Sequence, residues 1–365
     1  MIQFMYINPA MINPRTKENV REKEIAKILK WKEEGKKIIA MELNVKGLNE
    51  FCDLIIDPQH TDGNSDICCA KEVALHAKEL LGEYVGKDVV IVSPRLDVDS
   101  IAAMLLAEKF LNGGSVECTP YIEEINAHDT YKKGKWEKPI LTVSDIALLN
   151  NKNRNVEDEQ YLREKLALIF NPNDKMKAMA SSIKTFVDYS NEASMTNFME
   201  SRKNVRAFMA SGQVDQKILD SYAATQNSNI DKIMSGEVKI EYQYGGVHIE
   251  TKLLGMTDLV YAGAPAGTIY NPVMGKWTIC QFEEGYLQVV SSQKSGKPTL
   301  KVAEELSQKE PGWGGSTTIC GSPMGNASVL KPEEIKKEFF NCLTPEYKAK
   351  VTSRGVINAG KGMGE

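Results

Sequence analysis

The sequence lacks the features of membrane-spanning and secreted proteins. Its longest apolar stretches, such as residues 101–107, are far shorter than the roughly 20 residues that cross a bilayer. The first residues have no basic segment and are broken by Asn and Pro, so we expect no secretory signal. The 7 cysteines are scattered, with only Cys68 and Cys69 adjacent, unlike a secreted disulfide framework. We therefore expect a cytoplasmic protein that does not contact a membrane.

Signatures of several enzyme and nucleic-acid-binding classes are also missing. The 45 Lys and Arg residues against 49 Asp and Glu residues give a formal net charge of −4, so no overall basic field favours duplex nucleic acid. The chain contains no P-loop and no Gly-x-Ser-x-Gly motif. Its 4 histidines have no evident serine or cysteine partner, which argues against nucleophilic catalysis by those side chains.

What is present indicates a folded α/β protein. A chain of 365 residues with 42% hydrophobic and 26% charged residues is long enough for two or three globular domains. The first part alternates helix and strand patterns, which is typical of a parallel, Rossmann-like sheet covered by helices. The predicted strands are 37–43, 53–57, 88–92 and 115–121, and the predicted helices are 16–34, a segment ending at 81, and 100–111.

The composition changes along the chain and predicts four segments. Residues 1–150 form an α/β domain, and the polar residues 151–235 form a helical connector. Residues 236–345 form a smaller α/β domain with strands at 238–242 and 286–290, a helix at 300–309 and the glycine-rich run 311–316. Residues 346–365 form a flexible tail, because they carry several glycines and few apolar side chains.

Acidic residues and histidines follow the predicted strands of the first domain. Open parallel sheets bind ligands beyond the carboxyl ends of their strands, so we expect chemistry at this edge. The candidates are Glu42, Asp57, His60, Asp97, Asp99, His128 and Asp129.

The segment Asp97-Val98-Asp99 lies between a buried strand and a helix. Two carboxylates on such a loop suit Mn²⁺ or Mg²⁺, and pairs of these ions recur in phosphoryl transfer. Capping of the following helix is an alternative, since Asp and Ser are preferred at helix N-termini.

The other candidates also have structural alternatives. His60 can be an ordinary loop histidine, and His128-Asp129 can form a turn stabilised by Asp. The run Gly314-Gly315-Ser316-Thr317 can cradle an anion through backbone N–H groups, or it can simply make a tight turn. A zinc site at His60 with the paired cysteines lacks a second spaced pair of ligands.

Four segments resemble the DHH phosphoesterase superfamily and its C-terminal DHHA1 substrate-binding domain. Residues 89–103 are similar to a strand followed by the His-x-x-x-Asp-x-Asp motif, and residues 54–60 resemble a strand that ends in Asp-His-His. Residues 126–130 resemble a later motif that holds one more metal-binding aspartate. Residues 286–321 are similar to the strand, helix and glycine-rich run of DHHA1.

The chain departs from that family in order and in several residues. The segment that resembles Asp-His-His precedes the Asp-x-Asp segment, which implies a fortuitous match or a permuted order. Ser93 and Ser316 stand where the family has histidines, and Pro58 and Gln59 intrude into the segment that resembles Asp-His-His. Under the permuted order, Glu42 corresponds to the isolated carboxylate of the family's second motif.

The resemblance implies a phosphoesterase or phosphodiesterase, a hydrolase that uses one or two Mn²⁺ or Mg²⁺ ions. It implies small phosphorylated substrates, such as nucleotide monophosphates, dinucleotides or short oligonucleotides, and it allows a homodimer. A nucleotide-binding protein of the same fold without activity is the alternative. The resemblance implies that the catalytic residues are Asp97, Asp99 and His60. The metal ligands that it implies are Glu42, Asp57, His60, Asp97, Asp99 and Asp129. The substrate contacts that it implies are Arg95, His128, Gly314, Gly315, Ser316 and Thr317.

Overall fold

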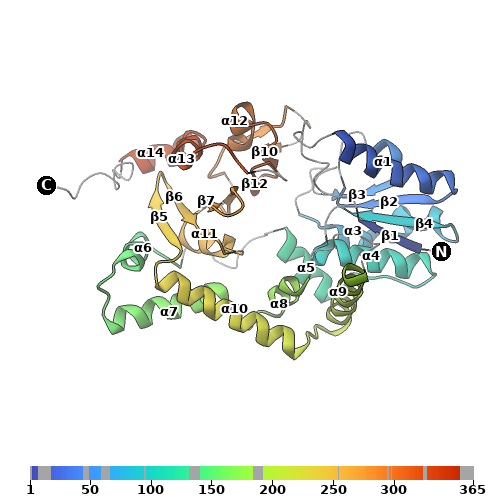
Figure 1. Ribbon diagram of the computed structural model, residues 1–365, viewed down its shortest axis with the longest axis horizontal. Coiled ribbons are helices and arrows are strands. Elements are labelled where there is room, and N and C mark those ends of the chain that lie inside the picture. Colours follow the sequence, from blue (N-terminus) through green and yellow to red (C-terminus); the bar gives the residue numbers. More distant parts are fainter. Residues whose placement is uncertain are drawn as a thin grey trace. The chain divides into compact units, whose positions relative to one another are not determined.

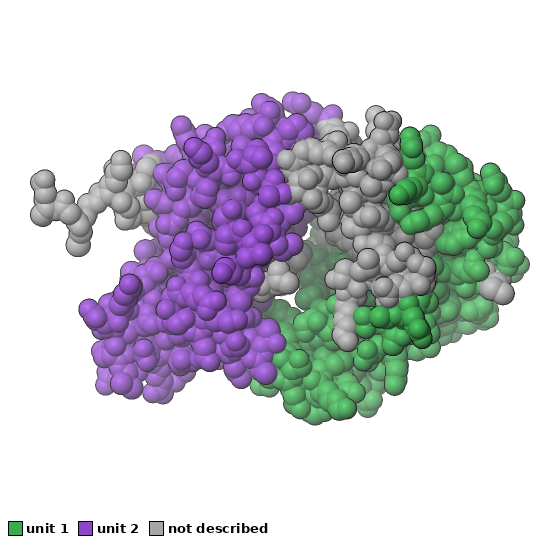
Figure 2. All heavy atoms as spheres, in the orientation of Figure 1, with its two compact units in different colours: residues 1–132, 173–223 green, residues 133–172, 224–365 purple. Residues whose placement is uncertain are grey.

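The chain forms two compact units, and neither is a continuous stretch of sequence (Figure 2). Unit 1 comprises residues 1–132 and 173–223, and unit 2 comprises residues 133–172 and 224–365. The structure is a computed structural model that describes residues 2–6, 18–43, 49–58, 66–93, 96–130, 140–183, 192–253, 255–283, 285–293, 296, 298–323 and 327–353.

Unit 1 contains a four-stranded parallel sheet (Figure 1). The strands are β1 (Ile2–Tyr6), β2 (Lys37–Met41), β3 (Leu54–Ile56) and β4 (Val89–Ser93), in the order β1-β4-β2-β3. Ile39 of β2 lies between Leu54 of β3 and Ile91 of β4 in the register. The predicted α/β class and the predicted strands at 37–43, 53–57 and 88–92 are thereby confirmed, whereas β1 was not predicted.

Helices cover both faces of this sheet. On one face Ile38 and Ala40 pack with Ile28 of α1 (Glu18–Glu33). On the other face Ile39 and Met41 join the core formed with α3 (Cys69–Leu81) and α4 (Val98–Leu111). Burial on both faces explains why β2 and β4 are continuous apolar runs rather than alternating ones.

Unit 1 contains further helices. They are α5 (Pro120–Asp129), α8 (Lys175–Ser182), α9 (Glu192–Ser211) and the first part of α10 (Gln216–Met234), with short 3₁₀ helices η2 (Asn49–Phe51) and η3 (Gly82–Tyr84). The predicted strand 115–121 is wrong. Thr119 caps α5 by accepting the N–H of Ile122, and Pro120 occupies the first turn, so these helix-starting signals outweigh the apolar pattern.

Unit 2 contains a six-stranded mixed sheet. Its strands are β5 (Lys239–Gln243), β6 (Gly246–Glu250), β7 (Ala266–Asn271), β8 (Lys276–Gln281), β11 (Gly314–Gly315) and β12 (Ile319–Gly321), in the order β11-β12-β8-β7-β6-β5. Only the pair β6 and β7 is parallel among these described strands. Strands β9 (Val289–Ser291) and β10 (Pro298–Leu300) form a separate pair.

Helices also cover both faces of the second sheet. Cys280 faces a core with α6 (Val143–Asn150), α7 (Val156–Phe170), the end of α10 and α11 (Thr257–Gly263). Ile279 faces a core with α12 (Lys301–Lys309), α13 (Pro332–Asn341) and α14 (Pro345–Ser353). The sequence at 238–242 and 300–309 forms the predicted strand and helix, as β5 and α12.

Two predicted segments differ from what the structure contains. Residues 151–235, predicted as one helical connector, form α7 to α10, and their residues are divided between the two units. The predicted tail begins inside α14, whose Val351 is buried in the core, and residues 354–365 lie outside the described residues. No helix in the described part of the chain has both the length and the apolarity to cross a bilayer.

Candidate metal centre

Glu42 stands directly after β2 at the carboxyl edge of the parallel sheet. Its backbone is left-handed, with φ of 51°, and its N–H donates to the carbonyl oxygen of Ile56 over 3.0 Å. A non-glycine residue in this conformation costs about 1 to 3 kcal/mol. Because Gly or Asn would occupy this position more easily, the presence of Glu favours a function for its side chain.

Asp97 begins the helix that follows β4, which is the direct neighbour of β2 in the sheet. Its Oδ1 accepts the N–H of Ser100 over 2.9 Å, and its own N–H donates to the Ser100 hydroxyl over 3.1 Å. These bonds form a capping box, so the capping role expected for Asp97 is confirmed.

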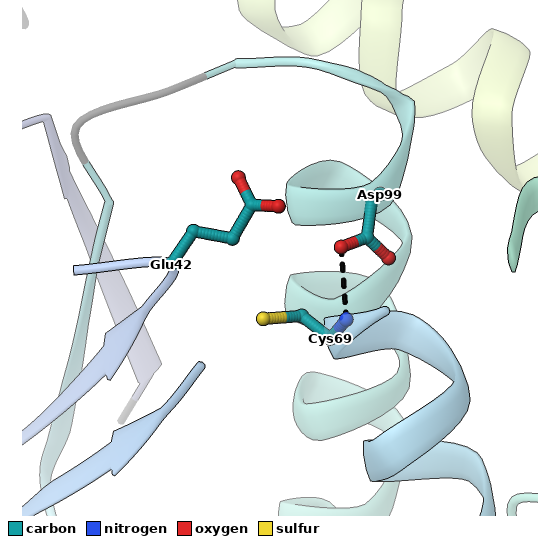
Figure 3. Close-up of side chains that lie close together, drawn as sticks. All are labelled: Glu42, Cys69 and Asp99. Carbon is teal, nitrogen blue, oxygen red and sulfur yellow. Dashed lines mark hydrogen bonds between the residues drawn. The ribbon is translucent and has the colours of Figure 1, made fainter. Parts of the chain in front are cut away.

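Asp99 caps a different helix. It is 2% exposed, and its two carboxylate oxygens accept the N–H groups of Cys69 over 2.9 Å and Ala70 over 2.8 Å, at the start of α3. Figure 3 shows the bond to Cys69. Burial raises the pKa of Asp99, and the nearby charge of Asp97 raises it further. Both aspartates of the motif therefore cap helices: Asp97 caps α4, and Asp99 of α4 caps α3 and thereby links the two helices.

The carboxylates come together in two clusters that share Glu42. Ligand atoms of Glu42, Asp97 and Asp129 lie within 4.8 Å of one another, and so do those of Glu42, Cys69 and Asp99. In Figure 3 the side chains of Glu42 and Asp99 point toward each other, with the Cys69 sulfur beside them. Two ionised carboxylates this close repel by roughly 3 kcal/mol at an effective dielectric constant of about 20. A divalent cation would turn this repulsion into attraction.

His128 and Asp129 lie in the last turn of α5, not after a strand as the sequence analysis expected. The C-terminus of a helix carries partial negative charge, so an aspartate there is disfavoured by about 0.3 to 1 kcal/mol. Asp129 is thus placed against the helix dipole and beside two other carboxylates, an arrangement that a cation would stabilise.

The start of α3 is fixed by side chains from two other helices. In addition to Asp99, Asn126 of α5 accepts the N–H of Cys68 over 2.8 Å and donates to the carbonyl oxygen of Asp66 over 3.3 Å. The Cys69 thiol donates to the carbonyl oxygen of Ile56 over 3.0 Å, and burial raises its pKa well above the usual value. Cys69 is therefore a protonated thiol at the edge of the carboxylate clusters.

Sequence reasoning missed Cys69 and Asn126 as parts of this site. The one available signal for Cys69 was its place soon after a predicted strand, where the helix of an α/β unit begins. Asn126 belongs to the segment 126–130 but had no expected role of its own, because its partners lie far away along the chain, with separations of 58 and 60.

A cavity of about 190 Å³ adjoins the clusters within unit 1. Asp97, Asp99, His128 and Asp129 line it, together with aliphatic side chains. Oxygen ligands of this kind suit Mn²⁺ and Mg²⁺ better than softer metals. The residues present thus fit the predicted kind of ion.

The remaining candidates of the first domain lie apart or are not described. Asp57 is buried directly after β3 and, with Glu42 and Asp99, raises the pKa of the Cys69 thiol. Among the described residues it belongs to neither cluster. His60 and Arg95 lie outside the residues that the structure describes.

The glycine-rich run forms a tight hairpin in unit 2. Gly314 and Gly315 pair with Gly321 and Cys320, and a β-carbon on Gly315 would lie 2.2 Å from the carbonyl oxygen of Ile319. The N–H of Ser316 donates to that same oxygen over 2.8 Å. The Ser316 hydroxyl accepts the N–H groups of Thr318 and Ile319 over 3.3 Å each. These amides bond within the hairpin, as the turn interpretation expects, and the role of Gly314 to Thr317 in substrate binding stays a prediction.

Comparison with known proteins gives no family for this chain. No family model matches it, and no curated protein is detectably similar. A crystal structure of an uncharacterized protein from Helicobacter pylori G27 aligns at 12% identity over 94% of this chain and 99% of that chain, with a TM-score of 0.18. A score this low does not indicate a shared fold, so the function has to be argued from the site itself.

Proposed function

We propose that this protein is a hydrolase, a phosphoesterase that depends on Mn²⁺ or Mg²⁺ and acts on small phosphorylated substrates. Nucleotide monophosphates, dinucleotides and short oligonucleotides are the substrates to test first. The observation that carries the proposal is the cluster of Glu42, Asp97 and Asp129, which come from three separate elements and adjoin a cavity. The proposed enzyme works in the cytoplasm.

The two clusters suggest where ions would be held. Glu42, Asp97 and Asp129 would hold one ion, and Glu42 with Asp99 would hold a second. When bound, such ions neutralise charge on a phosphoryl group and lower the pKa of a coordinated water. Because Glu42 belongs to both clusters, its side chain would fix the spacing between the two positions.

His128 supplies the proton donor that ester hydrolysis requires. The oxygen of a water molecule bonds to phosphorus as the bond from phosphorus to the ester oxygen breaks. The leaving alcohol takes up a proton from the donor, and the proton that the attacking water loses restores it. His128 lines the cavity one residue before Asp129, so its imidazole can deliver that proton or contact a phosphate oxygen. In addition to holding the second ion, Asp99 would keep α3 and α4 in place through its bonds to the start of α3.

A binding protein without catalysis is the second candidate, and one observation favours it. Both oxygens of Asp99 already accept backbone N–H groups of α3, which leaves fewer lone pairs for an ion. A site with one weakly held ion could retain a phosphorylated ligand without hydrolysing it.

Product release measured with Mn²⁺ distinguishes the two candidates. Phosphate and mononucleotide release are followed for nucleoside monophosphates, dinucleotides and short oligonucleotides with the wild type and Asp97→Asn. Asn caps a helix as well as Asp, so this variant keeps the fold and loses one carboxylate. The matched control is Glu123→Gln, which removes an exposed carboxylate of α5 that pairs with Lys71.

The proposed enzyme predicts turnover by the wild type and the control, and a loss of about 100-fold or more in Asp97→Asn. Ligand binding without turnover by the wild type would favour the binding protein. Equal turnover by the wild type and Asp97→Asn would contradict the proposed site.

A further inference from the structure

The segments that carry the carboxylates are joined by hydrogen bonds at the start of α3. The carbonyl oxygen of Ile56, at the end of β3, accepts the N–H of Glu42 over 3.0 Å and the thiol of Cys69 over 3.0 Å. Asp99 of α4 accepts the N–H of Cys69 over 2.9 Å. The start of α3 is therefore bonded, directly or through Ile56, to the segments that hold Glu42 and Asp97.

Asn126 connects α5 to the same network. Its side chain is 6% exposed, accepts the N–H of Cys68 over 2.8 Å and donates to the carbonyl oxygen of Asp66 over 3.3 Å. Both partners are backbone groups directly before α3, so these bonds follow the position of the helix start and not the rotamer of another side chain. A buried amide that bonds at both of its ends to one backbone segment holds α5 against the start of α3.

Asn126 lies close to one helical turn before Asp129 on α5. Residues three apart on a helix share a face and are separated by about 4.5 Å along the axis. A binding side chain has to be held within about 0.5 Å of its productive position, and Mg²⁺ binds its oxygen ligands at about 2.0 to 2.1 Å. A small slide or rotation of α5 would therefore take the Asp129 carboxylate out of reach of an ion held by Glu42 and Asp97.

The other described contacts of α5 are less suited to fix its slide and rotation. Ile122 and Ile125 are buried in the core of unit 1, but the hydrophobic effect is not directional, whereas a hydrogen bond has a defined distance and angle. Glu123 pairs with Lys71 of α3 over 2.7 Å, but its side chain is 51% exposed, and exposed ion pairs contribute little. The buried amide of Asn126 is the contact that sets where α5 lies along α3.

We infer that Asn126 is a positioning residue for the metal site, which holds α5 so that Asp129 stays within reach of the ion. This inference rests on the proposed function, because it gives Asn126 a part in binding that ion. Asn126 acts through Asp129 and does not itself coordinate the ion.

A double-mutant cycle tests whether Asn126 acts through Asp129. Asn126→Ala is made in the wild type and in Asp129→Asn, and calorimetric titration measures the Mn²⁺ affinity of each protein. Asp129→Asn keeps Glu42 and Asp97, so its affinity provides the reference for the second background. We expect Asn126→Ala to weaken Mn²⁺ binding about 10-fold or more in the wild type, but less than about twofold when Asp129 is already replaced.

Further measurements separate positioning from stability. Urea unfolding checks that each variant is folded under the titration conditions, and Asn126→Ser, which keeps a hydrogen-bonding group, takes the place of Asn126→Ala if that variant unfolds. Glu123→Gln removes the exposed link between α5 and α3 and should keep the Mn²⁺ affinity within about twofold of the wild type. The electron paramagnetic resonance spectrum of bound Mn²⁺ should change in Asn126→Ala as it does in Asp129→Asn, because both variants lose the same ligand.

The outcomes separate this inference from the proposed function. Equal losses of Mn²⁺ affinity in the two backgrounds would reveal a general structural effect, which overturns the inference and leaves the metal site standing. An Asn126→Ala variant that is folded and binds Mn²⁺ as tightly as the wild type overturns it as well. Failure of the wild type to bind Mn²⁺ overturns the proposed function and this inference together.

Discussion

At the carboxyl edge of the sheet in unit 1, Glu42, Asp97 and Asp129 reach one another from three separate elements, whereas in the hairpin of unit 2 Ser316 bonds to residues two and three positions away. The sequence makes both regions candidate binding sites because each combines polar residues with a predicted turn or loop. In the hairpin the bonds of Ser316 stabilise the turn itself. At the sheet edge carboxylates from three elements lie within 4.8 Å of one another, an arrangement that a divalent cation would stabilise.

Buried titratable groups in the two units respond to pH in opposite directions. In unit 1 the pKa of Asp99 is raised by burial, so its stabilising contribution is complete at low pH and is lost as the pH rises through that pKa. In unit 2 burial and Lys336 lower the pKa of His248 to about 3. The contribution of His248 is complete above its ordinary pKa and is lost as the pH falls.

The largest expected effect is acid destabilisation through His248. This residue is 3% exposed, and its ring nitrogens lie 2.9 Å from the Thr268 hydroxyl and 2.8 Å from the carbonyl oxygen of Gln243. Between the ordinary pKa of 6.5 and about 3, the unfolded chain binds a proton that the folded chain does not. The free energy of unfolding should fall by on the order of 5 kcal/mol over this range. Urea unfolding at several pH values should show that the free energy of unfolding falls more steeply with decreasing pH in the wild type than in His248→Gln. An equal pH dependence in the two proteins would contradict the role of His248.

The next effect separates the two aspartates of the Asp-x-Asp segment. Asp99→Ala leaves the N–H groups of Cys69 and Ala70 without their acceptor, so we expect a loss of about 2 to 4 kcal/mol in the free energy of unfolding. Asp97→Asn retains a good cap for α4, so the free energy of unfolding should change by less than about 0.5 kcal/mol. Urea unfolding without added metal measures both values. Equal losses in the two variants would show that the capping roles are misassigned.

Glu42→Gln tests the residue that both carboxylate clusters share. The substitution keeps the size of the side chain and removes its charge, so it should weaken Mn²⁺ binding by about 10- to 100-fold, or about 1.4 to 2.7 kcal/mol. Calorimetric titration checks this, with Glu123→Gln on α5 as the charge-matched control. An affinity loss of similar size in the control would point to a general effect of charge.

The smallest effect concerns the hairpin of unit 2. Ser316→Ala removes the acceptor for the N–H groups of Thr318 and Ile319, which should cost about 0.5 to 1.5 kcal/mol in thermal unfolding. If these bonds serve only the turn, the affinity for inorganic phosphate should change by less than about twofold, or about 0.4 kcal/mol. A tenfold loss of phosphate binding would instead make the hairpin an anion site and remove the contrast between the two regions.

The sequence predicted much of the first sheet because its strands are distinct apolar runs. Strands β2 and β4 are buried on both faces, and their patterns leave little alternative to a parallel sheet. Strand β1 was missed because its five residues alone give too short a pattern to distinguish a strand. Residues 115–121 failed as a strand because Thr119 and Pro120 start a helix there.

The candidate site could be predicted only in part, because local sequence patterns place the residues that follow strands but not those that meet through helix packing. Glu42 and Asp97 follow neighbouring strands, so the rule for parallel sheets was enough to place them together. Asp129 joins them from the end of a helix, and Cys69 and Asn126 acquire their roles through contacts between helices distant in sequence. Such contacts depend on how the helices pack, which local patterns do not encode.

The central claim is tested most directly by titrating the metal-free protein with Mn²⁺ and comparing it with the double variant Asp97→Asn/Asp129→Asn. Both substitutions keep the shape of the side chains, and the Asp97→Asn change retains a cap for α4, as argued for the single variant. The account predicts uptake of one or two ions by the wild type and a loss of about 100-fold or more in affinity for the double variant. Absence of Mn²⁺ binding to the wild type, or equal binding to both proteins, would contradict it.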